Sequence, residues 1–90
     1  MIQNGNFKLC YEVGIMLKYG ISTLKNENES LSYWFLGLEN EIISCVEPIK
    51  IYFLEKTSRL KYYKKISKSG NDIYSKRWNL ILKYKIHHQI

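Results

Sequence analysis

The sequence lacks the features of a secreted or membrane-spanning protein. Its longest uninterrupted apolar run, Tyr33 to Leu38, is far too short to cross a bilayer. The start of the chain, Met1 to Lys8, lacks the charged and apolar regions of a signal peptide. We therefore expect a cytoplasmic location and no membrane partner.

Cysteine is scarce, since Cys10 and Cys45 are the only two. They are far apart in the sequence and lack the closely spaced thiol pair typical of zinc sites. Two buried, reduced thiols are the predicted state in a cytosolic protein, with a disulfide as the alternative. We predict no metal and no other cofactor.

No arrangement of side chains indicates catalysis, and 90 residues are fewer than the usual catalytic superfolds need. Glu39 and Glu41 are two residues apart on a predicted helix, so their carboxylates diverge. His87 and His88 are adjacent, face opposite sides of a predicted strand and have no third ligand nearby in the sequence. The prediction is a non-enzymatic protein that forms a single domain over residues 1–90.

Alanine is absent and arginine is rare. Twelve lysines stand against two arginines, accompanied by twelve isoleucines and seven asparagines. This bias is typical of A+T-rich coding DNA, as in many phages and plasmids, and it bears on source more than on activity. The shortage of arginine argues against detailed readout of base edges, because arginine is the usual bidentate partner of guanine.

The strongest structural signal is a helix over residues 30–46. Its apolar residues recur at the spacing of one helical face: Leu31, Trp34, Phe35, Leu38, Ile42, Cys45 and Val46. Asn28 or Ser30 is predicted to cap its start. Pro48 is predicted to end it, because the residue before a proline avoids the α region. The two large aromatic residues on this face predict a core helix.

The segment from Phe7 to Tyr19 supports two interpretations. Every second residue is apolar, which favours a strand, and its aromatic and β-branched content agrees. The same segment contains a helical stripe, but Gly14 and Gly20 would each cost a helix about 1 kcal/mol relative to alanine. We predict strands bent near Gly14, with a helix as the alternative.

The C-terminal half predicts a β-hairpin. Alternating runs between Arg59 and Ile86 flank Ser69-Gly70-Asn71-Asp72, a strong turn signal. A three-residue loop in this turn separates apolar residues from charged ones on the two faces. The predicted fold class is therefore α+β, a small, mostly antiparallel sheet packed on the central helix of residues 30–46. The alternative is a helix from Ile49 to Lys68, capped by Gly70, within an all-α four-helix arrangement.

Charge is divided unevenly along the chain. Residues 1–49 hold three lysines and six glutamates, a net charge of −3, whereas residues 50–90 hold eleven Lys and Arg against two acidic residues, a net charge of +9. Such a density attracts polyanions, although a charged sheet face is often only solvated and protects edge strands. On the charged face of the hairpin, the predicted nucleic-acid-binding residues are Arg59, Lys61, Tyr63, Lys65, Arg77, Lys83 and Lys85.

The lead hypothesis is that this basic face binds RNA, single-stranded DNA or a nucleic-acid-containing complex. Its cations would hold phosphates without reading sequence, and Tyr63 would stack on a base. The alternative is a protein-binding inhibitor or adaptor of the phage or plasmid type, which blocks a host protein through the basic face or the acidic N-terminal half. The divided charge and an exposed edge strand also permit a homodimer.

Overall fold

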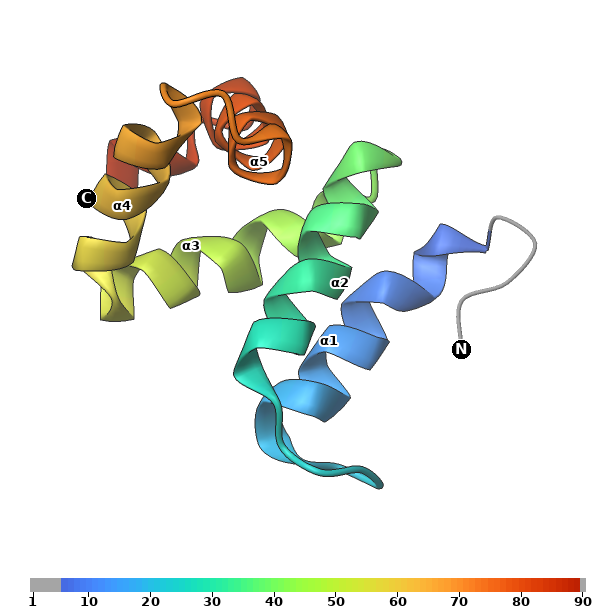
Figure 1. Cartoon of the computed structure of the whole chain (residues 1–90). Helices are drawn as coiled ribbons and strands as arrows, with labels where there is room; N and C mark the ends of the chain where they lie inside the picture. The colour runs from blue at the N-terminus through green and yellow to red at the C-terminus, as the bar shows by residue number, and fades with distance from the viewer. Residues whose placement is uncertain (1–5, 90) are drawn as a thin grey trace. The chain divides into compact units, whose positions relative to one another are not determined.

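The computed structural model describes residues 6–89, and this part of the chain is helical and contains no β-strand (Figure 1). The α-helices are α1 (Cys10–Tyr19), α2 (Glu27–Glu39), α3 (Val46–Glu55), α4 (Thr57–Ser67) and α5 (Asp72–Lys83). The 3-10 segments are η1 (Phe7–Leu9), η2 (Ile43–Cys45) and η3 (Ile86–Gln89). The α+β prediction is therefore wrong, and the all-α alternative describes the architecture, with five α-helices in residues 6–89 where four were expected.

The chain divides into two compact units, a first unit of Met1–Val46 and a second unit of Glu47–Ile90. The prediction that residues 1–90 form a single domain stays a prediction. Within residues 6–89, none of the helices is both long enough and apolar enough to cross a membrane.

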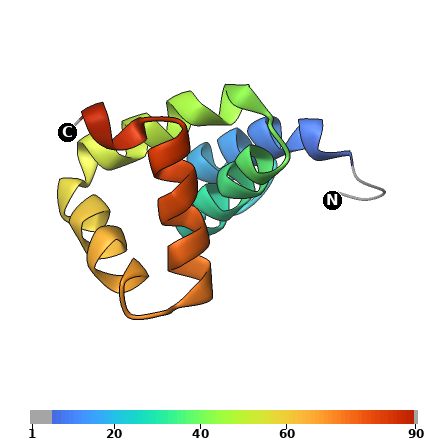
Figure 2. The ribbon, with the colours of Figure 1, turned by 90° about the horizontal axis from the view of Figure 1, so that it is seen from above.

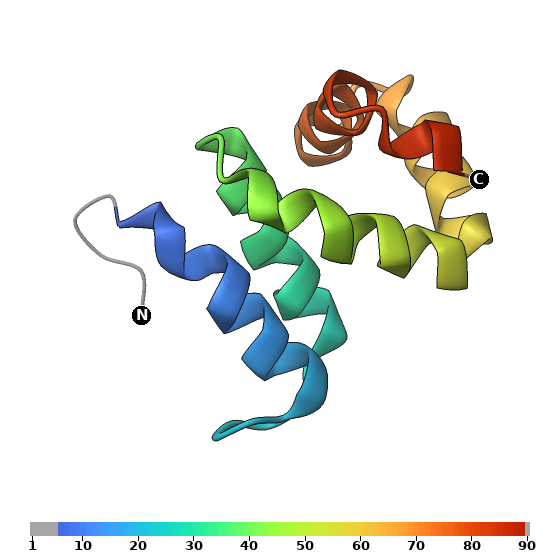
Figure 3. The same cartoon turned by 180° about the vertical axis from the view of Figure 1, so that it is seen from behind.

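In the first unit, α1 and α2 lie side by side and run in opposite directions (Figures 1 and 3). The strands predicted between Phe7 and Tyr19 are wrong. The buried residues of α1 are Cys10, Val13, Gly14 and Leu17, which follow the helical stripe and not the alternation. Packing against α2 therefore selects the helical period of a segment whose sequence carries both periods.

Gly14 is a position of close approach between α1 and α2. A Cβ atom added to Gly14 would overlap the indole of Trp34. The indole Nε1 donates a hydrogen bond to the Tyr11 carbonyl oxygen (3.3 Å), and the Ser30 hydroxyl donates one to the Gly14 carbonyl oxygen (2.7 Å). Gly14 was taken as evidence against a helix, but its missing side chain makes room for the tryptophan of the neighbouring helix.

Replacing Gly14 by alanine should therefore destabilise the protein by about 1–3 kcal/mol, the usual cost of overpacking a core. Helix propensity alone predicts the opposite sign, a gain of up to about 1 kcal/mol. Chemical denaturation of wild type and Gly14→Ala measures the difference. In a Trp34→Leu background the alanine should cost less, and an equal cost in both backgrounds would contradict the proposed contact.

The helix predicted over residues 30–46 is shorter than expected and starts earlier. Its N-cap is Asn26, whose side-chain oxygen accepts a hydrogen bond from the Glu29 amide (3.1 Å), in place of Asn28 or Ser30. It ends at Glu39 because Glu41 adopts a left-handed conformation with φ of 63°.

Two backbone hydrogen bonds close this end of α2. The Ile42 amide donates to the Gly37 carbonyl (2.9 Å), and the Glu41 amide donates to the Leu38 carbonyl (3.1 Å). This pair is the Schellman pattern of helix termination. Pro48 was predicted to end this helix, and that prediction is wrong. Pro48 lies in the first turn of α3, where its missing N–H costs no helical hydrogen bond.

Glu41→Gly should stabilise the protein by about 0.5–1 kcal/mol, because glycine adopts the left-handed conformation without steric cost. In an uninterrupted helix the same substitution would destabilise by about 1 kcal/mol. Glu39→Gly is the matched control inside the helix and should destabilise. Thermal and denaturant unfolding of both variants measures the sign, and a loss of stability in Glu41→Gly would contradict the observed helix end.

Both cysteines are free and fully buried, as the sequence predicted. They flank Gly37 of α2: a Cβ atom there would overlap the Cys45 sulfur and lie 3.2 Å from the Cys10 Cβ. Burial, followed by the nearby Cys10 and Glu12, raises the pKa of Cys45 to about 12. Burial also raises the pKa of Cys10. Both thiols are therefore protonated in the folded protein at neutral pH.

The raised pKa of Cys45 predicts a loss of stability at high pH. Between about pH 9 and 12 the unfolded chain releases the thiol proton while the folded chain retains it, so unfolding becomes more favourable as pH rises. Well below pH 9 the thiol is protonated in both the folded and the unfolded chain, so this group contributes no pH dependence there. The free energy of unfolding of wild type should therefore approach that of Cys45→Ala as pH rises from 9 to 11, and parallel curves would contradict the prediction.

In the second unit, α4 and α5 form a helical hairpin in place of the predicted β-hairpin (Figure 2). The predicted turn is present, because Gly70 has a φ of 87° and the Asn71 side chain caps α5 by accepting from the Tyr74 amide (3.2 Å). The flanking elements are helices and not strands, so the two faces predicted for the hairpin are wrong as well. The alternative helix from Ile49 to Lys68 is interrupted at Lys56, which has non-helical φ and ψ of −130° and 67°.

Candidate nucleic-acid interface

The residues predicted to bind nucleic acid do not share one face in the structure. Four of them, Arg59, Lys61, Tyr63 and Lys65, lie on α4, whereas Arg77 and Lys83 lie on α5 and Lys85 follows it. The four lysines among these residues are exposed. The two arginines are partly buried, and Tyr63 is buried. The structure therefore separates the lysines from the other three residues.

Tyr63 belongs to the core of the second unit and is 1% exposed. Its ring packs edge-on against Phe53 of α3 and Tyr74 of α5, with centroid distances of 5.4 and 4.8 Å. Its hydroxyl accepts a hydrogen bond from Arg77 Nη1 (2.9 Å). Burial raises the pKa of Tyr63, partly offset by the Arg77 charge. The ring offers no free face to a base, so Tyr63 does not supply the predicted stacking surface.

Both arginines contact tyrosines. The Arg59 guanidinium lies over the rings of Tyr62 and Tyr63, 5.2 and 5.9 Å from their centroids. The pKa of Arg59 is raised, mainly by a hydrogen bond with the Tyr52 side chain. Arg59 lies over the Tyr63 ring and Arg77 donates a hydrogen bond to the Tyr63 hydroxyl. Both arginines therefore support the aromatic core of the second unit.

Exposed lysines instead gather on one face of α4 and its C-cap residue, Lys68. Lys61, Lys64, Lys65 and Lys68 stand at positions i, i+3, i+4 and i+7 and are all exposed. This spacing places them within an arc of about 100° around the helix axis, on the side away from Tyr63. We call these four residues the lysine stripe. The segment Thr57–Ser67 contains no acidic residue that could neutralise them locally.

The lysine stripe has a structural role as well. Lys64 and Lys65 lie in the last turn of α4, where cations interact favourably with the helix dipole. Lys64 and Lys68 were missed by the sequence analysis because a strand pattern places them on different faces from Lys61 and Lys65. Counting the same residues at helical spacing would have found all four.

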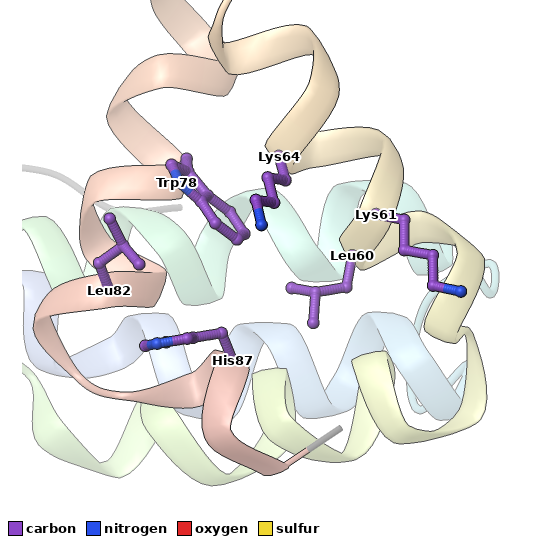
Figure 4. A pocket seen from close by; sticks show the side chains of 6 residues that line it. All are labelled: Leu60, Lys61, Lys64, Trp78, Leu82 and His87. Carbon is purple, nitrogen blue, oxygen red and sulfur yellow. The ribbon is translucent and has the colours of Figure 1, made fainter.

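A cleft of about 370 Å³ opens beside the lysine stripe in the second unit (Figure 4). Its lining residues are Leu60, Lys61, Lys64, Trp78, Leu82 and His87. Trp78 reaches from α5 toward Lys64 on α4, whereas the end of Lys61 points away from the other side chains. The centroids of the Trp78 and His87 rings are 6.3 Å apart, and the two ring planes form an angle of 57°. The cleft therefore combines aromatic and apolar walls with cations at its edge.

His87 lines this cleft, although the sequence analysis found only that it lacks partners for a metal site. Its Nδ1 atom is buried and has no hydrogen-bond partner among the described residues. In residues 6–89 no group of three or more His, Cys, Asp or Glu side chains is placed to hold a metal ion. Trp78 is partly exposed and lines the cleft, and the sequence analysis did not single it out.

Comparisons with protein-family models, with curated protein sequences and with solved structures find no match to this chain. Its function is therefore inferred from its side chains and their surroundings.

Proposed function

We propose that this chain is a non-enzymatic binding protein that holds RNA or single-stranded DNA through the lysine stripe of α4. The observation that carries the proposal is the exposure of four lysines on one face of a helix without acidic residues. The second unit as a whole holds eleven Lys and Arg against Glu47, Glu55 and Asp72, a net charge of +8. This charge favours association with polyanions.

The dimensions of the stripe suit a few backbone phosphates. From Lys61 to Lys68 the helix rises by about 10 Å, at 1.5 Å per residue. Neighbouring lysines at i, i+3 and i+4 are about 5–6 Å apart at their Cβ atoms, and their long side chains adapt to a flexible strand. The stripe would therefore contact two to four phosphates, roughly, and each contact on a single strand adds about 0.7 to the slope of log affinity against log salt.

The placement of arginine supports recognition of the backbone over recognition of sequence. Both arginines contact the core residue Tyr63, and the exposed cations of the stripe are lysines. Lysine acts on a phosphate as a point charge and lacks the planar fork that pairs with guanine. We therefore expect similar affinities for strands of different sequence. The proposal also includes a cytoplasmic location and no catalytic activity.

The lysine stripe predicts a position-specific loss of binding. Fluorescence anisotropy with labelled single-stranded RNA and DNA, between low and near-physiological salt, should show affinity falling with log salt. In Lys65→Gln/Lys68→Gln the salt slope should fall by about 1.4, because up to two phosphate contacts are lost. Lys8→Gln/Lys25→Gln is the matched control, since it removes the same charge from exposed positions on the first unit.

Equal losses in these two double variants would show that net charge alone governs binding and would contradict the stripe. Absence of binding at low salt would contradict the nucleic-acid proposal altogether. The alternative of a protein-binding inhibitor or adaptor would then be tested by affinity capture after nuclease treatment, with a single stoichiometric protein as the supporting result.

A further inference from the structure

We propose that the cleft lined by Trp78 and His87 receives one unpaired base of a bound strand, with Trp78 as the stacking residue. This inference rests on the proposed function and specifies the ligand class as single-stranded nucleic acid with an accessible base. It assigns to Trp78 the stacking that the sequence analysis had assigned to Tyr63.

The walls of the cleft suit a flat aromatic ring. Leu60 and Leu82 are apolar, and the rings of Trp78 and His87 come from two different elements, α5 and η3. Trp78 is partly exposed, in contrast to Trp34, which is 1% exposed. A base has an apolar π-face, and stacking on tryptophan removes this face from water while its polar edge stays solvated at the opening.

The size of the cleft restricts its occupant. A volume of about 370 Å³ lies near the lower limit of ligand pockets, which span roughly 300–1,000 Å³. The cleft is therefore large enough for one base and small for a larger ligand. A base within a duplex is paired and stacked on both sides, so entry would require the strand to open. This geometry favours single strands over duplexes.

Lys64 connects the cleft to the lysine stripe. It is a member of the stripe and also lines the cleft, and its side chain extends toward Trp78 (Figure 4). A strand whose phosphates lie along the stripe would therefore pass the opening, with one base next to Trp78. Charge complementarity decides between occupants, because Lys64 extends toward Trp78 while none of the six lining residues is acidic. A neutral apolar ligand would gain nothing from this cation.

The test compares a normal oligothymidylate with an abasic oligonucleotide of the same length, which carries the same phosphates and no bases. Wild type should bind the normal strand roughly five- to one-hundred-fold more tightly, the range expected for stacking of one base. Trp78→Leu should reduce this ratio to about one, whereas Trp78→Phe should retain most of it. Tyr19→Leu is the matched control, because Tyr19 is an aromatic residue of the first unit that is 63% exposed.

A second variant guards against misfolding of Trp78→Leu. Leu82 is 42% exposed, so Leu82→Trp fills the cleft from a tolerant position and should also reduce the ratio to about one. Circular dichroism and thermal unfolding confirm that each variant is folded. If wild type binds both oligonucleotides equally tightly, the base-binding cleft is overturned and the lysine stripe stands. If wild type binds neither, both proposals are overturned.

Discussion

The hydrogen bond from Arg77 to the hydroxyl of Tyr63 joins α5 to α4 in the core of the second unit. A phenol that is 1% exposed needs a partner, because an unsatisfied buried hydroxyl costs about 1–3 kcal/mol. Arg77 supplies the donor from α5, and Phe53 of α3 packs against the same ring. One tyrosine on α4 is thereby tied to two neighbouring helices. The use of Arg77 inside the unit also determines which cations remain outside it.

The division of labour between the two kinds of cation connects the fold to the proposed function. Arginine stacks on tyrosine rings and bonds their hydroxyls, as Arg59 and Arg77 do. Lysine keeps its ammonium in water, and the four residues of the lysine stripe are all exposed. A surface built in this way attracts phosphates strongly and distinguishes sequences poorly. Any selectivity must then come from shape, which is the role proposed for the cleft beside Trp78.

The sequence predicted parts of this fold because, in some segments, the apolar residues recur only at helical spacing. Leu31, Trp34 and Leu38 are buried as the helical stripe predicted, and the turn at Gly70 is where it was expected. The segment around residues 59–67 carries both periods, since Leu60 pairs with Tyr62 at strand spacing and with Tyr63 at helical spacing. Tertiary contacts distinguish them: Tyr63 is buried against Phe53, Tyr74 and Arg77, whereas Tyr62 is 42% exposed. The candidate site was therefore predicted in part. Lys61 and Lys65 are on the stripe, but their neighbours Lys64 and Lys68 could be grouped with them only on a helix.

The burial of Cys10 and Cys45 around Gly37 has a practical consequence for studying this molecule. Neither sulfur is accessible to a reagent in water, and both remain protonated near neutral pH. A single cysteine introduced on the surface would therefore be the one thiol available to a maleimide dye or a spin label. The native residues need not be removed, so the close contact of α1, α2 and η2 stays intact. A protein that keeps both native cysteines can therefore be labelled at one chosen surface position for spectroscopy.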